Sequence, residues 1–393
     1  MSTTSRNRRS PSRRRRVAAV GVSLSDCGRV DEATPYSLHA QAARRALADS
    51  GLDRSLVDGL ASAGLGTLAP VEVAEYLGLR PRWVDSTAVG GATWEVMAAH
   101  AADAIGAGRA NAVLLVYGST ARADIRAGRR TGNLSFGARG PLQFEVPYGH
   151  SLIAKYAMAA RRHMHEYGTT LEQLAEVAVR ARAHAALNPE AMFREPITVD
   201  DVLDGPVIAD PFTKLHCCIR SDGGCAVLLA AEEYVPDTAK APVWVLGTGE
   251  YVSHAAMSEW EDFTVSPAAV SGRLAFERAG VGPGDIELAQ IYDAFTYMTL
   301  VTLEDLGFCA KGEGGAFFAQ EDRLPVNTDG GGLSACHPGM RGLFLLVEAV
   351  RQLRGEAPGL QVRRPDGALP ELAVASGTGG WFCSSGTVVL GRG

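Results

Sequence analysis

The chain has 393 residues, of which 46% are hydrophobic and 21% are charged, and this composition supplies enough apolar material for large cores. It excludes a disordered chain, a collagen and a small disulfide scaffold. The formal net charge is −6, yet residues 1–16 carry seven arginines and no acid. We therefore expect a disordered basic tail over 1–16, followed by an acidic body that does not bind nucleic acid.

Neither a metal site nor a membrane span is indicated by the residue pattern. The seven cysteines are scattered and include no C-x-x-C pair. His163 and His165 are separated by one residue, and alternate residues of a helix point in nearly opposite directions, so the pair is a poor chelate. No stretch approaches about 18 uninterrupted apolar residues. The sequence therefore predicts a cytoplasmic protein that binds no metal.

Apolar strand-like runs and helical stretches alternate along the chain. A run at 17–24 is followed by a helical stretch at 37–51, whose Gly51 sits where a C-cap glycine belongs. A helical stretch at 96–108 and a buried strand at 110–119 repeat this βαβ pattern.

The second part of the chain repeats the first. Residues 46–60 and 275–289 align without gaps, and the helix at 342–355 with the strand at 371–377 echoes 96–119. The sequence predicts an α/β fold of two similar halves, at 17–236 and 241–393.

Residues from about 120 to 210 have a different character. They contain long helical stretches with capping patterns at 169–172 and 198–201. We expect a helical lid inserted in the first half. Such an insertion either shapes the entrance to a site or serves only as a packing appendage.

Two glycine-rich segments, 327–339 and 376–380, are candidate ligand-binding loops. Clustered glycines let backbone N–H groups approach a ligand, as the oxygen of an enolate or thioester requires. Neither segment has the pattern of a nucleotide phosphate loop. His337 lies in the first segment, and its imidazole can exchange protons near neutral pH. It is the first candidate for acid–base chemistry, although a lone histidine is more often structural.

Three ordered segments resemble motifs of one family. They read NTDGGGLSACHPG at 327–339, YDAFTYMTLVTLEDLGFC at 292–309 and LHCCIRSDGGCAVLLAAEEY at 215–234. These stretches are similar to the Asn-x-x-Gly-Gly…Gly-His-Pro, His-Asp-Cys-Phe-Ser and Gln-Cys-Cys segments of the thiolase superfamily, in the sterol carrier protein X branch of nonspecific lipid-transfer proteins. The resemblance spans 17–393. It implies the thiolase fold, in which two similar halves form αβαβα layers.

One feature of that family is missing. A thiolase carries a nucleophilic cysteine at the start of the helix after its third strand, where the helix N-terminus lowers the pKa of the thiol. The matching segment at 84–94 has no cysteine and offers instead Ser86, Thr87, Gly90 and Gly91. The second family cysteine is also absent from 374–380. Ordinary acyl-enzyme chemistry is therefore not expected.

The resemblance implies that the groups handling a thioester enolate are retained. It places His337, from the Gly-His-Pro motif, and Tyr292, which replaces a family Asn or His, at the thioester oxygen. Asp293 is expected to orient loops through backbone hydrogen bonds. Further supporting side chains and backbone N–H donors are expected from Asn327, Cys336, Gly331, Gly379 and Gly380.

These residues predict retro-aldol cleavage. A base removes the β-hydroxyl proton of an acyl-CoA, the Cα–Cβ bond breaks, and preorganised donors hold the enolate. The coenzyme A thioester is then the substrate, and no bound cofactor is expected. Two alternatives stay open: a non-catalytic acyl-CoA or lipid-binding protein, and an acyltransferase that uses a hydroxyl or Cys336.

Residues 147–179 further resemble an actinobacterial branch linked to steroid side-chain degradation. Some members of that branch are aldolases that work with a small partner built from an OB-fold and a zinc ribbon. Two tyrosines carry their reaction; Tyr292 matches the first, and His337 stands at the position of the second. The resemblance thus implies a bulky lipid or steroid acyl group, a homodimer and, in that branch, a small protein partner.

Overall fold

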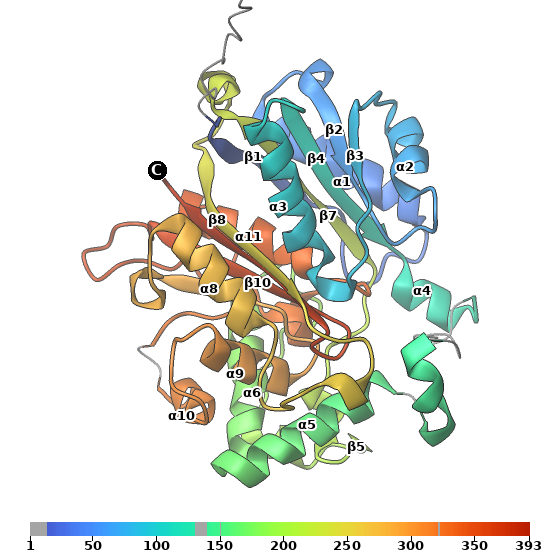
Figure 1. Ribbon diagram of the computed structural model, residues 1–393, viewed down its shortest axis with the longest axis vertical. Helices are drawn as coiled ribbons and strands as arrows, with labels where there is room; N and C mark the ends of the chain where they lie inside the picture. The colour runs from blue at the N-terminus through green and yellow to red at the C-terminus, as the bar shows by residue number, and fades with distance from the viewer. Residues whose placement is uncertain (1–13, 130–139, 150, 321–322) are drawn as a thin grey trace, which may run out of the picture.

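The computed structural model describes residues 14–129, 140–149, 151–320 and 323–393. Within them, nine strands form one sheet in the order β3-β2-β4-β7-β1-β8-β11-β10-β9 (Figure 1). The strands of the first half are β1 (Val17–Leu24), β2 (Val57–Ala61), β3 (Trp83–Asp85), β4 (Ala112–Ser119) and β7 (Gly223–Ala231). The strands of the second half are β8 (Val243–Val252), β9 (Leu288–Ile291), β10 (Leu372–Gly379) and β11 (Ser384–Gly391).

The two halves of the sheet meet at a short seam. Strands β1 and β8 pair antiparallel through only two residue pairs, Ala18 with Trp244 and Ala19 with Val243. Each half keeps a longer ladder of its own, since β1 pairs with β7 over most of its length and β8 pairs with β11. The sheet is therefore continuous, but only two residue pairs join its two half-sheets.

Helices cover the half-sheets in layers. Helix α1 (Pro35–Ser50) packs on β1, β4 and β7, with α2 (Ala69–Leu77) beside it, and α8 (Ala268–Ala279) packs on β8 and β11. Helices α3 (Thr93–Gly106) and α11 (Gly342–Arg354) contact each other and strands of both halves. This is the αβαβα layering expected from the resemblance.

The internal repeat predicted from the sequence is present in the structure. Helix α1 ends at Gly51 with φ +71° and α8 ends at Gly280 with φ +72°, the left-handed conformation that glycine adopts readily. Each helix is followed by a 3₁₀ turn and a strand, β2 or β9. A Cβ on Gly249 would lie 2.0 Å from the carbonyl oxygen of Ser271, so glycine there lets α8 lie directly on β8.

The segment between β4 and β7 is helical, as predicted. Helix α6 begins with a capping box, but the box joins Thr170 and Gln173 rather than the predicted 169–172 pattern; the box at Thr198 and Asp201 is confirmed. Helices α5 and α6 pack against α9 of the second half, and Figure 1 shows them in green below both halves. The helices and hairpin of this segment are α4 (Ala121–Arg126), α5 (Leu152–Tyr167), α6 (Leu171–Leu187), α7 (Val199–Leu203), β5 (Val207–Ala209) and β6 (Phe212–Thr213). The remaining helices of the second half are α9 (Thr296–Asp305) and α10 (Gly314–Phe318).

The basic tail was expected to extend to residue 16, and its described end corrects that boundary. The Arg15 side chain donates to the carbonyl of Ile105 at 2.9 Å, and the Arg16 guanidinium lies 3.8 Å from the centre of the Trp244 ring. Because of these contacts, Arg15 and Arg16, which precede β1, belong to the folded body rather than to the tail. Residues 1–13 lie outside the described residues. No helix of the described chain is long and apolar enough to cross a membrane.

Candidate active site

Tyr292 and His337 face each other in the interior. The Tyr292 hydroxyl lies 3.2 Å from Nε2 of His337, with the two rings nearly perpendicular at 85°. Tyr292 is 5% exposed and His337 is 9% exposed. The sequence placed both at one site, and the structure brings them into hydrogen-bonding contact although 45 residues separate them.

The end of β9 fixes the position of Tyr292. The amide of Ile291 donates to Oδ1 of Asn327 at 2.7 Å, and the Tyr292 amide donates to the carbonyl of Ser376 at 3.0 Å. A Cβ on Gly91 would lie 2.4 Å from Cζ of Tyr292, so only glycine leaves room for the phenol ring there. Asn327 therefore holds backbone, and Gly91 packs against the ring at the start of α3.

Separate contacts hold the loop that carries His337. The His337 amide donates to Oγ of Ser221 at 2.9 Å, and the Tyr117 hydroxyl donates to the carbonyl of Pro338 at 2.8 Å. The Cys336 thiol lies 3.2 Å from the same Ser221 hydroxyl. Cys336 thus points toward the segment just before β7, where Ser221 also holds the backbone of His337.

Burial keeps both members of the pair neutral. It raises the pKa of Tyr292 well above its ordinary value and lowers the pKa of His337 to about 4. At neutral pH the site therefore holds a phenol beside an uncharged imidazole. Such a pair can donate a hydrogen bond to a developing oxyanion and pass a proton between its members.

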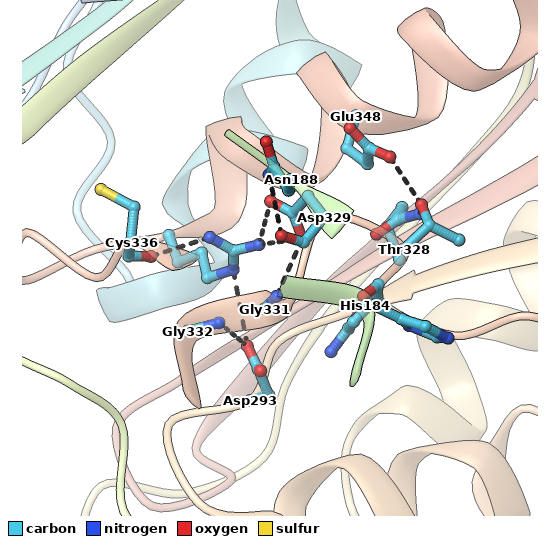
Figure 2. Close-up of polar contacts among 12 residues, drawn as sticks. His184, Asn188, Asp293, Thr328, Asp329, Gly331, Gly332, Cys336 and Glu348 are labelled. Atoms are coloured by element: carbon cyan, nitrogen blue, oxygen red, sulfur yellow. Dashed lines mark hydrogen bonds and ion pairs between the residues drawn. The ribbon is translucent and has the colours of Figure 1, made fainter. Parts of the chain in front are cut away.

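A buried ion network lies directly behind the pair. Arg341 is fully buried, and its guanidinium donates to the carbonyl of Cys336 at 2.7 Å and to both carboxylate oxygens of Asp329 at 2.6 Å. Its Nε lies 3.5 Å from Asp293 (Figure 2). Asp293 follows Tyr292 in the chain, and Cys336 precedes His337. One side chain therefore contacts both segments that carry the pair.

Asp293 behaves as expected from the sequence. Its carboxylate accepts hydrogen bonds from the amides of Gly332 at 2.7 Å and Leu333 at 3.2 Å. Burial raises the pKa of Asp293 to about 7, although the Arg341 charge opposes that rise. The residue orients the glycine-rich loop through its backbone.

The network extends from the ion cluster into helix α11. Glu348 accepts from the Thr328 hydroxyl at 2.6 Å and from the Gln352 amide at 2.8 Å. Figure 2 shows the Thr328 contact on the helix side of the loop. Burial raises the pKa of Glu348 to about 7. The glycine-rich loop is therefore held from both β9 and α11.

Not all of the glycines predicted to donate backbone N–H groups to the substrate can do so. The Gly331 amide is already donated to Oδ1 of Asp329 at 2.9 Å, which corrects its assignment as a substrate donor. Gly379 and Gly380 lie at the end of β10, where a Cβ on Gly90 would come within 2.8 Å of Gly379 Cα and of the Gly380 nitrogen. These two glycines meet the Gly90–Gly91 pair beside Tyr292.

The hydroxyls at the family's nucleophile position are not hydrogen-bonded to a histidine among the described residues. Ser86 is exposed, and the Thr87 hydroxyl donates to Oδ1 of Asp85 at 2.8 Å. The other oxygen of Asp85 lies 2.7 Å from Nδ1 of His100, and this hydrogen bond contributes most to raising the pKa of His100 to about 10. The raised pKa of His100 favours its charged form at neutral pH, so the cluster lacks the neutral histidine that would take a proton from Thr87.

Glu95 is a buried acid that the sequence reasoning missed. It is 1% exposed at the start of α3, and neither carboxyl oxygen has a hydrogen-bond partner in another residue of the described chain. Glycines make room for it, because a Cβ on Gly377 or Gly342 would lie 2.0 or 2.5 Å from Oε2. A single acid in an otherwise apolar helix start was the available signal. Among the described residues, no group of His, Cys, Asp and Glu is arranged to hold a metal ion.

The buried state of Glu95 predicts a pH-dependent stability difference. Burial raises the pKa of Glu95 well above its ordinary value of 4.5, so its contribution to stability is complete below pH 4.5 and is lost as the pH rises toward the folded pKa. Glu95→Gln removes this titration with little change of shape. Relative to wild type, its free energy of unfolding should rise by about 1.4 kcal/mol per pH unit above about pH 5. Urea unfolding over a pH series measures this, and a difference that stays constant with pH would contradict it.

Comparison with known proteins supports the same architecture. A family model described as "Thiolase C-terminal domain-like" matches residues 249–392. A steroid side-chain-cleaving aldolase of Thermomonospora curvata is 33% identical over 92% of this chain and 95% of its own. A 17-hydroxy-3-oxo-4-pregnene-20-carboxyl-CoA lyase of Mycobacterium tuberculosis is 32% identical over 92% of this chain and 96% of its own.

A solved structure named Ltp2-ChsH2(DUF35) aldolase has a TM-score of 0.84 and 30% identity over 96% of this chain and 97% of its own. The similarity therefore extends over the whole fold rather than one half. The chain belongs to the thiolase superfamily, in the branch that contains the steroid side-chain-cleaving aldolases.

Proposed function

We propose that this protein catalyses retro-aldol cleavage of a β-hydroxyacyl-CoA that carries a steroid or similarly bulky group. The observation that carries the proposal is the hydrogen-bonded, buried pair of Tyr292 and His337 in a thiolase fold whose nucleophile position has no cysteine. A retro-aldol reaction needs proton transfer and enolate stabilisation, and it needs no covalent capture of the acyl group.

The reaction balances with the groups at hand. The Tyr292–His337 pair accepts the proton of the β-hydroxyl, whose oxygen becomes the carbonyl of a ketone as the Cα–Cβ bond breaks. The bonding electrons form the enolate of the shortened thioester. The proton is then returned to Cα, which leaves a ketone and a shortened acyl-CoA. Donors beside the pair stabilise the enolate oxygen, and Gly379 and Gly380 are our candidates for these donors.

Two kinds of observation support this choice over its alternatives. Both full-length relatives reported above are named for cleavage reactions on steroid side chains or a CoA thioester. The acyltransferase alternative requires an activated nucleophile, yet Cys336 is held by Ser221, and Thr87 by Asp85. A non-catalytic acyl-CoA or lipid-binding protein would bind the thioester without turnover, and this is an outcome of the experiment below.

Removing either member of the pair should abolish cleavage. Tyr292→Phe and His337→Gln each remove one proton-transfer group, so kcat should fall by about 100- to 10,000-fold. Mass spectrometry of products from a steroidal β-hydroxyacyl-CoA measures the ketone and the shortened acyl-CoA. Tyr36→Phe, which loses a surface hydrogen bond to Glu72, is the matched control and should keep the wild-type rate.

Three results would decide against the proposal in different ways. Saturable acyl-CoA binding without cleavage would indicate the lipid-binding alternative. A shortened acyl-CoA formed only from a β-ketoacyl-CoA and free CoA would indicate a thiolase reaction. Cleavage at the wild-type rate in both variants would mean that the protein catalyses the reaction without using Tyr292 and His337.

We propose in addition that a small partner protein takes part. The structural neighbour named Ltp2-ChsH2(DUF35) aldolase carries two protein names, which supports a protein partner. The OB-fold and zinc-ribbon type of that partner is our expectation from the resemblance to the actinobacterial branch. The product analysis is therefore run with and without such a co-purified partner.

A homodimer formed through the edge strand β3 is also part of the proposal. Strand β3 lies at one end of the sheet order, and Val84 in its middle is 50% exposed. An edge strand leaves backbone N–H and C=O groups open to pairing with another strand. The resemblance to thiolases implies a homodimer, so a second copy of this edge is our candidate partner.

A charge on this edge should separate the protomers. We expect sedimentation velocity at micromolar concentration to give twice the chain mass of 41.4 kDa for the wild type and a monomer for Val84→Lys. Val71→Lys is the control, because Val71 is similarly exposed at 56% but lies on α2. A monomeric wild type would show that the proposed dimer is wrong. A dimeric Val84→Lys would show that β3 is not part of the dimer interface.

A further inference from the structure

A tight turn closes the end of strand β10 against the candidate site. It comprises Gly379 to Phe382 and connects β10 to β11. A Cβ on Gly91 would lie 2.4 Å from both the carbonyl oxygen of Thr378 and Cζ of Tyr292. The strand end that leads into the turn and the catalytic phenol therefore pack on the same glycine.

The turn holds a bulky residue in an unfavourable backbone conformation. Phe382 has φ +56°, in the left-handed region that large L-residues rarely adopt, and it is completely buried. Its ring packs against Trp260 and Tyr297, with centroids 5.6 and 6.2 Å away. A conformation of this kind persists only where surrounding contacts enforce it.

Tyr156 supplies such contacts from the inserted segment. It lies on α5 and is completely buried, and its hydroxyl donates to the carbonyl of Gly380 at 2.8 Å. The same oxygen accepts a hydrogen bond from the Phe382 amide at 3.0 Å. One hydroxyl therefore bridges two residues of a single turn, and both of its hydrogen bonds are made to backbone.

We propose that Tyr156 is a positioning residue for the reaction: its hydroxyl holds the Gly379–Phe382 turn in the strained form that sets the Gly379 and Gly380 backbone beside Tyr292. The proposal rests on the proposed function. It also gives the insertion a role in catalysis, because α5, a helix of the segment inserted in the first half, then determines the shape of the site.

Loss of the hydroxyl has a definite structural consequence. In Tyr156→Phe the partly buried Gly380 carbonyl loses its hydrogen bond from the tyrosine and the buried Phe382 amide loses its acceptor, which favours a rearranged turn. Small displacements of donors at a reaction centre lower the rate strongly. Because oxyanion donors act mainly in the transition state, kcat should fall by about 10- to 100-fold while KM changes little.

Tyr297→Phe is a matched control. Tyr297 is also completely buried, its ring also packs on Phe382, and its hydroxyl donates to one backbone carbonyl, that of Phe263, at 3.0 Å. It makes no hydrogen bond to the turn among those of the described residues. Both variants keep the aromatic ring and lose a buried hydroxyl, so a merely structural role would give similar losses of Tm and similar rates.

The test measures kcat, KM and the hydrogen exchange of peptides covering 379–383 in both variants. We expect the lowered kcat and faster exchange at Phe382 only in Tyr156→Phe. Equal kcat values for the two variants, or unchanged exchange at Phe382, would overturn the proposal. If the wild type cleaves no β-hydroxyacyl-CoA, the proposed function fails, and the exchange comparison still decides whether Tyr156 holds the turn.

Discussion

The guanidinium of Arg341 is completely buried, and its burial is tolerated because Asp329 and Asp293 lie against it and the Cys336 carbonyl accepts one of its hydrogen bonds. Removing one partner of such a buried ion pair costs about 3–5 kcal/mol, so the arrangement is strongly constrained. Asp293 is joined by a peptide bond to Tyr292, and Cys336 to His337. The buried charge therefore helps to set the separation of Tyr292 and His337, the two side chains that we propose for proton transfer, which come from distant parts of the chain.

The same burial determines what chemistry the pair can perform. A phenol with a raised pKa and an imidazole with a lowered pKa are both uncharged at neutral pH, so the pair carries no charge before the reaction begins. Charge first develops when the β-hydroxyl loses its proton and the enolate forms. A dry, preorganised site acts most strongly at that moment. In the proposed reaction the thiolase fold stabilises the enolate, and the family's nucleophile position at 84–94 has no cysteine to form an acyl-enzyme.

The fold could be predicted from the sequence because hydrophobic periodicity and the repeated helix–glycine–strand units are local signals, as at Gly51 and Gly280. The motifs that contain Tyr292 and His337 also predicted that the two side chains share one site, and the structure places them in contact. The sequence patterns did not identify Arg341, Asp329, Glu95 or Tyr156 as candidate site residues. The role of each depends on burial or on contacts between segments more than ten residues apart. Gly331 is a residue whose predicted role was wrong. Its glycine-rich context predicted an amide that donates to the substrate, but that amide donates to the neighbouring carboxylate of Asp329.

In the proposed reaction the carbon–carbon bond is broken without an acyl-enzyme. Intact-protein mass spectrometry after acid quenching during turnover of a β-hydroxyacyl-CoA tests it most directly. The account predicts an unmodified chain mass while ketone and shortened acyl-CoA accumulate. An acyl adduct that forms and decays at the rate of product formation, and that maps to Cys336, Ser86 or Thr87, would contradict it.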